Sequence, residues 1–185
     1  MNRPRPLGGG SLSLAFPVRV RKNSGMDIFE EFIGVVNALK AAKIEFAVCG
    51  GFAMALHGLP RFTQDIDLLV RPDDLEPIVD VVKSCGFDVD SGIMQFGIDT
   101  NRQTEIRRVN KIFGKEYLTL DLLIVGPSLD DVWARKVDFT YRDQTVPAVS
   151  AAGLIKMKRI AGRPQDLADI DRLENKNNDP AALPD

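Results

Sequence analysis

Histidine and cysteine are scarce in this sequence, which contains only His57, Cys49 and Cys85 of these two types. The cysteines show neither CxxC nor Cys/His spacing, so a structural zinc site is not expected. A single histidine excludes a histidine-rich metal site. Its place at the end of a short predicted helix favours packing or hydrogen bonding over catalysis. Such sparse cysteine usage fits a reducing compartment, and we expect a cytoplasmic protein.

The sequence also lacks a long apolar run, since no segment approaches the roughly 18 residues that a bilayer-spanning helix needs. We therefore expect no membrane partner. The 185 residues suit one domain, and 44% hydrophobic with 27% charged residues is an ordinary globular composition. Enough apolar material is present to form a core.

A large net charge of either sign is absent as well, because the formal charge of the whole chain is −2. Residues 1–25 hold five basic residues and no acidic one, which leaves −7 for the rest of the chain. An acidic body does not attract nucleic acid over its whole surface. A polynucleotide would therefore have to bind at a local basic patch.

Pro, Gly and Ser dominate residues 1–25, which show no period of 2 or 3.6 and are predicted to be a disordered leader. The apolar stretch in it is short and broken by Pro17, which disfavours a secretory signal. Met26 precedes the first periodic segment, and we hypothesise that translation starts there or that the leader is dispensable. The domain is expected over residues 26–175, followed by a frayed tail over 176–185.

The rest of the chain alternates helical and strand patterns. Helices are predicted at 27–39, 52–58, 73–86, 150–162 and 164–175. Strands are predicted at 44–49, 65–70, 104–113 and 117–125, with a hairpin over 139–149. These elements predict a small mixed α/β (α+β) domain with a sheet of about five strands flanked by helices and a helical C-terminus.

Two acids open the apolar strand "DIDLLV". Asp65 and Asp67 are two residues apart in a strand and therefore point to the same face. Like charges this close raise each other's pKa unless a cation lies between them. Magnesium, which prefers carboxylate oxygens and leaves coordination sites open for phosphate, satisfies that need.

A third acid, Asp121, is the only charged residue in the buried-type strand predicted at 117–125. Taken alone, it fits a hydrogen-bonded structural aspartate equally well, because burying an unpaired carboxylate is costly. Taken with the two acids of the neighbouring strand, it favours a metal site. Asp88 and Asp90 form another DxD, but glycines flank it and no apolar run follows, so a solvated strand end explains that pair.

Gly50 and Gly51 follow the strand 44–49 and precede a short helix. Glycines let backbone N–H groups approach an anion, and a helix N-terminus favours negative charge. No GK[ST] follows, so this is not a Walker loop. On its own, a Gly-Gly turn is most often only a tight turn.

The segments "CGG…HGLPRFTQDIDLLV" and "GLIKMKRIAGRPQDLADIDRL" together resemble the nucleotidyltransferase superfamily typified by DNA polymerase beta. Within it, they look most like the minimal bacterial nucleotidyltransferases related to AbiEii-type toxins. The resemblance spans roughly residues 44–173 and contains the glycine turn, the DxD strand, the later aspartate and the C-terminal block in the family order. Many relatives have Gly-Ser where this chain has Gly50-Gly51, so that hydroxyl contact does not carry over.

The resemblance implies transfer of a nucleoside monophosphate from an NTP, such as ATP, to an acceptor hydroxyl. Asp65 and Asp67 would hold two Mg²⁺ ions against the triphosphate, and Asp121 would complete the ion that activates the hydroxyl. The backbone amides of Gly50 and Gly51 would position the β- and γ-phosphates.

The remaining residues of the matched segments are expected around the nucleotide. The resemblance implies that Lys158 contacts the triphosphate and that Arg163 flanks the same loop, whereas an amphipathic helix alone would put Lys158 in solvent. Arg61 is expected to meet phosphate or to pair with an acid, and Thr63 to form local hydrogen bonds. Asp166 and Asp169 would anchor these basic residues or cap the last helix.

Three functions remain open on the sequence. The first is a toxin-like enzyme that modifies RNA, tRNA or protein and has a cognate antitoxin as partner. The second is transfer to a small molecule, as in aminoglycoside nucleotidyltransferases, which an acidic body mildly favours. The third is a non-catalytic nucleotide-binding module, which the retention of three costly carboxylates argues against.

Overall fold

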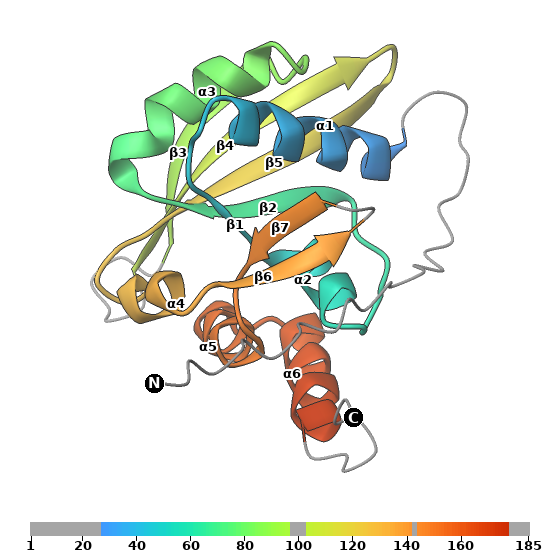
Figure 1. Ribbon diagram of the computed structural model, residues 1–185, viewed down its shortest axis with the longest axis vertical. Coiled ribbons are helices and arrows are strands. Elements are labelled where there is room, and N and C mark those ends of the chain that lie inside the picture. Colours follow the sequence, from blue (N-terminus) through green and yellow to red (C-terminus); the bar gives the residue numbers. More distant parts are fainter. Residues whose placement is uncertain (1–26, 97–102, 142–143, 178–185) are drawn as a thin grey trace, which may run out of the picture.

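The computed structural model describes residues 27–96, 103–141 and 144–177 (Figure 1). The predicted leader, hairpin residues 142 and 143, and residues 178–185 of the predicted tail lie outside this part of the chain. Residues 176 and 177 belong to the last helix, which therefore extends two residues into the predicted tail. Within the described residues, no helix is long and apolar enough to cross a membrane.

A mixed sheet forms the centre of the fold, in the strand order β3-β4-β5-β2-β1-β7-β6. Its strands are β1 (Ala47–Val48), β2 (Asp65–Val70), β3 (Val89–Phe96), β4 (Thr104–Phe113), β5 (Glu116–Ile124), β6 (Val137–Tyr141) and β7 (Gln144–Ala148). The predicted α/β class with a helical C-terminus is confirmed, and the described sheet has seven strands where about five were predicted.

The pairing of β2 with β5 decides the geometry of the centre. These strands run parallel, and Asp67 lies opposite Asp121 in the register. On the far side, β5 pairs antiparallel with β4, which puts Arg108 opposite Asp121. Side chains of paired residues point to the same face of a sheet. Charged side chains from β4, β5 and β2, which are neighbours in the sheet, therefore lie on one face.

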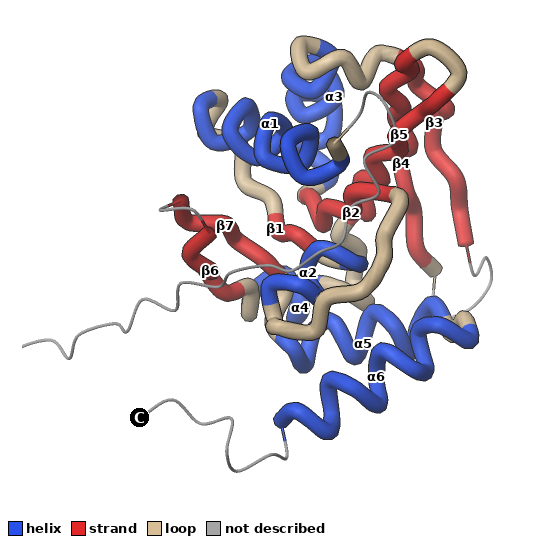
Figure 2. The backbone as a smooth tube through the Cα atoms, turned by 90° about the vertical axis from the view of Figure 1, so that its right-hand side faces the viewer, coloured by secondary structure: helices blue, strands red, loops and turns tan. Residues whose placement is uncertain are grey.

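Helices cover both sides of the sheet (Figure 2). On one side lie α1 (Ile28–Ala41) and α3 (Leu75–Lys83), the latter preceded by a short 3-10 turn η1 (Pro72–Asp74). On the other side lie α2 (Gly50–Leu56), α4 (Asp130–Ala134), α5 (Ala151–Ala161) and α6 (Pro164–Asn177). The Asp27 side chain accepts a hydrogen bond from Phe29 N at 2.9 Å and caps α1, as predicted.

One part of the core lies between the sheet and α1 and α3, and residues of α2, α4, α5 and α6 also belong to the buried apolar cluster. Val35, Val36 and Leu39 of α1 are completely buried, as are Ile66 and Leu68 of β2. Because side chains alternate along a strand, Ile66 and Leu68 face this core while Asp65 and Asp67 face the opposite side. The apolar face of β2 thus fixes where its two acids point.

One strand was missed by the sequence prediction. The Asp88–Asp90 segment was read as a solvated strand end, whereas β3 continues to Phe96 and forms the edge of the sheet. Most of its side chains are exposed on both faces, so it lacks the alternation of apolar and polar residues that marks a half-buried strand. Arg107 donates to both carboxylate oxygens of Asp90, at 3.0 Å from Nε to Oδ1, and lowers the pKa of that carboxyl.

Candidate active site

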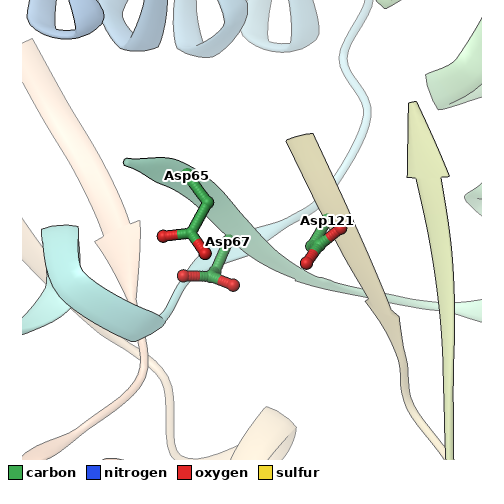
Figure 3. A group of neighbouring side chains, drawn as sticks. All are labelled: Asp65, Asp67 and Asp121. Carbon is green, nitrogen blue, oxygen red and sulfur yellow. The ribbon is translucent and has the colours of Figure 1, made fainter. Parts of the chain in front are cut away.

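Three carboxylates converge on the face of the sheet opposite α1 and α3 (Figure 3). Oxygens of Asp65, Asp67 and Asp121 all lie within 4.8 Å of one another. Asp65 and Asp67 come from the start of β2, and Asp121 comes from the middle of β5, where only 5% of its surface is exposed. The structure therefore brings together the three acids that the sequence singled out.

The crowding of these three carboxylates affects the pKa of Asp67. Its pKa is raised from the usual 3.8 to about 7, first by burial and then by the charges of Asp65 and Asp121. Arg163 and Arg61 lie near enough to oppose this rise. A set of hard carboxylate oxygens that repel one another suits a divalent cation such as Mg²⁺. The donor set therefore fits the metal that the sequence predicts.

Gly50 lies directly against these acids. Its φ of +58° is in the left-handed region, and a Cβ on it would fall 1.8 Å from Oδ2 of Asp67. A Cβ on Gly51 would meet the Thr63 hydroxyl at 2.5 Å. The Gly-Gly turn is therefore needed so that the start of α2 can approach β2 closely. Contact of either amide with phosphate stays a prediction.

A Gly50→Ala substitution is expected to reduce nucleotidyl transfer by at least about tenfold and to lower the free energy of unfolding by about 1–3 kcal/mol, since the methyl group would displace Asp67 and strain the backbone. Chemical denaturation and activity assays measure the two effects. Gly114→Ala is a matched control, because Gly114 also has a positive φ (+62°) but a Cβ added to it would meet nothing within 4 Å. Equal activity losses in the two variants would contradict the close-approach argument.

Arg108 is part of this centre, although sequence reasoning missed it. Its Nε and Nη2 donate to the two oxygens of Asp121, each at 2.7 Å. This bidentate pair supplies the positive charge that lets Asp121 remain buried. The strand 104–113 was predicted correctly, but its register against β5 cannot be read from sequence. No motif therefore marked Arg108.

Lys158 lies in α5 and is 4% exposed, so the solvated-face interpretation of this residue is wrong. Its ammonium donates to Asp169 at 2.6 Å and to Asp166 at 3.5 Å. Both acids are 2% exposed and belong to α6. The expected anchoring role of Asp166 and Asp169 is thus seen. In this arrangement Lys158 joins α5 to α6, and its contact with triphosphate stays a prediction.

Two arginines connect the same acids to the carboxylate centre. Arg61 Nε donates to Asp169 at 2.9 Å, and Arg163 Nε donates to Asp166 at 2.8 Å. The Arg163 side chain is 73% exposed and so has free donors on the solvent side. Both guanidinium groups lie close enough to lower the pKa of Asp67. They therefore bring positive charge close to the carboxylates, and contact of either arginine with phosphate stays a prediction.

The two remaining predicted residues form local contacts. The Thr63 hydroxyl donates to Asp65 Oδ1 at 2.8 Å and so orients that carboxylate. His57 Nε2 is hydrogen-bonded to Val149 O at 2.9 Å, and its ring packs edge-on against Phe139. The expected hydrogen-bonding and packing role of His57 fits this position.

Comparison with known proteins then decides the family. The sequence profile of the family described as nucleotidyl transferase AbiEii toxin, Type IV TA system, matches residues 36–185. The chain belongs to this AbiEii family. The predicted resemblance and the predicted enzyme class, nucleotidyltransferase, are both confirmed. No curated protein matches the sequence.

Solved structures share the AbiEii-family fold at low sequence identity. A provisionally assigned nucleotidyltransferase from Thermotoga maritima has a TM-score of 0.53 at 16% identity, over 80% of this chain and 93% of that one. ANT(2″)-Ia, solved in complex with adenylyl-2″-tobramycin, has a TM-score of 0.52 at 14% identity, over 82% and 90%. These likenesses concern the fold.

Magnesium binding to this AbiEii-family protein is expected to release about one proton per protein molecule at pH 6 and almost none at pH 8, because the pKa of Asp67 is about 7. A folded-state pKa above the unfolded value stabilises the fold at acid pH. That contribution is lost as the pH rises from about 4 through 7. Calorimetric titrations in buffers of different ionisation enthalpy count the protons, and a pH-independent count would contradict the raised pKa.

Proposed function

We propose that this protein is a Mg²⁺-dependent enzyme that transfers a nucleoside monophosphate from an NTP to a hydroxyl group of RNA, and that it acts as the toxin of a toxin–antitoxin pair. The observation that carries the proposal is the convergence of Asp65, Asp67 and Asp121 within 4.8 Å beside the Gly50 turn. The family match supports the reaction class and suggests a cognate antitoxin.

In the proposed in-line displacement, the acceptor oxygen bonds to the α-phosphorus while the bond from that phosphorus to the α–β bridging oxygen breaks and pyrophosphate leaves. The side chains would divide the work of this step. Asp65 and Asp67 would hold the metal ions between β2 and the triphosphate, while Asp121 would complete the site nearest the acceptor and take the proton of its hydroxyl. Bound Mg²⁺ would neutralise phosphate charge and lower the pKa of that hydroxyl. Arg163 and Arg61, which already lie near Asp67, would bind the triphosphate oxygens.

The rate gain in this scheme comes from positioning and electrostatics. Thr63 fixes the Asp65 carboxylate through its 2.8 Å hydrogen bond, and the parallel register fixes Asp67 beside Asp121. The Lys158 pairs hold α5 and α6 together, so that Arg163 at their junction stays near the acids. Each acid would therefore be in place before substrate arrives.

Transfer to an aminoglycoside-type small molecule is the second candidate. The fold shared with ANT(2″)-Ia, whose structure contains an adenylylated tobramycin, favours it, as does the acidic body of the chain. A cationic acceptor of this kind requires an acidic pocket beside the carboxylates.

Incubation of the full chain with Mg²⁺, each α-labelled NTP, and total RNA, cell protein or a panel of aminoglycosides tests these functions. Label in the RNA supports the proposal. Label found only in protein or in an aminoglycoside would show that this molecule, and not RNA, is the acceptor. Nucleotide that binds but is not turned over would contradict catalysis. An Asp65→Asn/Asp67→Asn variant is the negative control for each arm.

A further inference from the structure

A hollow of about 520 Å³ lies on the open face of β3, β4 and β5, and its lining includes Arg108, whose guanidinium is paired with Asp121 of the carboxylate centre. Arg108, Asn110 and Ile112 of β4 line it, together with Tyr117 and Thr119 of β5. These residues alternate along their strands and share the face of Asp121, because Arg108 pairs with Asp121 and Asn110 with Thr119 in the register. The helices α1 and α3 cover the other face (Figure 2).

The mouth of the hollow carries flat and apolar side chains. Tyr117 is 73% exposed and Ile112 is 58% exposed. Exposed large side chains of this kind, side by side on two paired strands, have little structural reason to face water. An aromatic face and a neighbouring aliphatic side chain form the type of platform on which nucleic-acid bases stack.

Positive charge lies at both ends of this platform. Lys115 is exposed, and within the described residues it forms no ion pair. At the inner end, Arg108 uses Nε and Nη2 for Asp121, and Nη1 forms no hydrogen bond within the same described part. A guanidinium has five N–H donors, so this group can hold Asp121 and still bind a phosphate. Glu116 is the one acid among the lining residues.

Polar groups form the floor. The Thr119 hydroxyl donates to Asn110 Oδ1 at 2.9 Å, and Asn110 Nδ2 donates to Ser91 Oγ at 3.0 Å. Among the residues that the structure describes, no partner is seen for the Ser91 hydroxyl hydrogen or for the second N–H of Asn110, so both can bond a ligand. The floor therefore offers donors to the edge of a base or to a ribose hydroxyl.

We propose that this hollow binds the 3′ end of a single-stranded RNA acceptor, with bases on Tyr117 and Ile112 and backbone phosphates at Lys115 and Arg108. The inference rests on the proposed function and names its acceptor site. Tyr117 lies four residues from Asp121 along β5, roughly 13 Å at about 3.3 Å per residue. At about 3.4 Å per stacked base, that span holds roughly three or four nucleotides. The terminal hydroxyl would then reach the carboxylates.

The donors of the lining favour an RNA end over the two other occupants. Asp121 compensates the charge of Arg108, but the remaining N–H groups of Arg108 and the ammonium of Lys115 are donors for an anionic ligand, whereas a polycationic aminoglycoside needs acceptors. A protein partner would bury a broader surface, whereas a volume of about 520 Å³ is of small-ligand size. Arg108 lies in the hollow and contacts Asp121, so a ligand in the hollow lies next to the carboxylates. An acceptor needs this proximity, whereas a protein partner does not.

Binding of a fluorescent single-stranded RNA oligonucleotide to the full chain tests the inference. Tyr117→Ala is expected to weaken binding about tenfold, whereas Tyr117→Phe keeps the stacking face and binds like the parent protein. Phe113→Ala is the matched control, since Phe113 is 53% exposed on the paired strand β4 but points to the opposite face. Lys115→Gln is expected to reduce the slope of log affinity against log salt by about 0.7.

The same variants, assayed for labelling of RNA at saturating NTP, separate this inference from the proposed function. A raised KM for RNA in Tyr117→Ala, with unchanged nucleotide affinity, supports the acceptor site. Undiminished RNA binding and labelling in that variant would overturn the site and leave the proposed function standing. If RNA binding depends on Tyr117 but the protein labels no acceptor, the RNA-binding site is supported and the proposed nucleotidyl transfer to RNA is contradicted.

Discussion

Asp67→Asn is expected to lower nucleotidyl transfer by on the order of 10³-fold or more, because the substitution removes a proposed metal ligand and the negative charge that would attract the cation. The same change is expected to raise the free energy of unfolding of the metal-free protein at pH 8 by roughly 1–3 kcal/mol. At that pH the Asp67 carboxyl, whose pKa is about 7, is charged and crowded by Asp65 and Asp121. A neutral amide relieves the repulsion.

Activity assays and urea denaturation of the metal-free protein at pH 8 measure the two opposite effects. Asp90→Asn is the control, since Asp90 belongs to the other DxD and is held on the surface by Arg107. That variant is expected to keep its activity and to change stability by less than about 1 kcal/mol. An Asp67→Asn protein that is inactive but less stable than the parent would contradict the like-charge argument.

Lys158→Met is expected to lower the free energy of unfolding by about 3–5 kcal/mol. The substitution leaves Asp166 and Asp169, each 2% exposed, without the ammonium that lies between them. Arg163 and Arg61 would still pair with these acids, so the loss is expected to come from the carboxylate oxygens that no longer accept a hydrogen bond from the buried ammonium. Urea denaturation at pH 7 measures it.

Lys156→Met, two residues away on the same helix, is the matched control. Lys156 pairs with Asp131 at the surface, where the two side chains are 41% and 48% exposed. Its loss is expected to cost less than about 1 kcal/mol. Equal costs for the two variants would show that the buried network contributes no more than a surface ion pair. A further loss of NTP affinity in Lys158→Met alone would support its predicted contact with triphosphate.

Much of the site was predictable because short-range patterns determine it. The strand 65–70 was predicted with the bounds of β2, since a run of apolar residues follows two acids spaced for one face. The predicted strand 104–113 likewise coincides with β4. Once β2 and β5 pair in the observed register, strand geometry places their acids together on one face.

The parts that were not predicted depend on long-range pairing. Arg108 joins Asp121 only because β4 and β5 adopt one particular register, which a one-residue slip would destroy. Lys158 looked like part of a solvated face because Lys156 and Arg159 lie beside it in sequence. Its burial is decided by the packing of α6, whose acids come eight and eleven residues later. The sequence of β3 shows no alternation of apolar and polar residues, because β3 lies at the edge of the sheet and most of its side chains are exposed.

Arg61 and Asp169, which form an ion pair, lie 108 residues apart in the sequence. This separation has a consequence for synthesis of the protein. The glycine turn, the DxD strand and Asp121 leave the ribosome well before α6 does. Until then Arg61 and Lys158 lack the acid they share, so the basic groups near the carboxylates are not held in place. The three carboxylates of a nascent chain would thus be present before Arg61 and Lys158 are fixed beside them, and the candidate site would be fully assembled only after α6 has emerged.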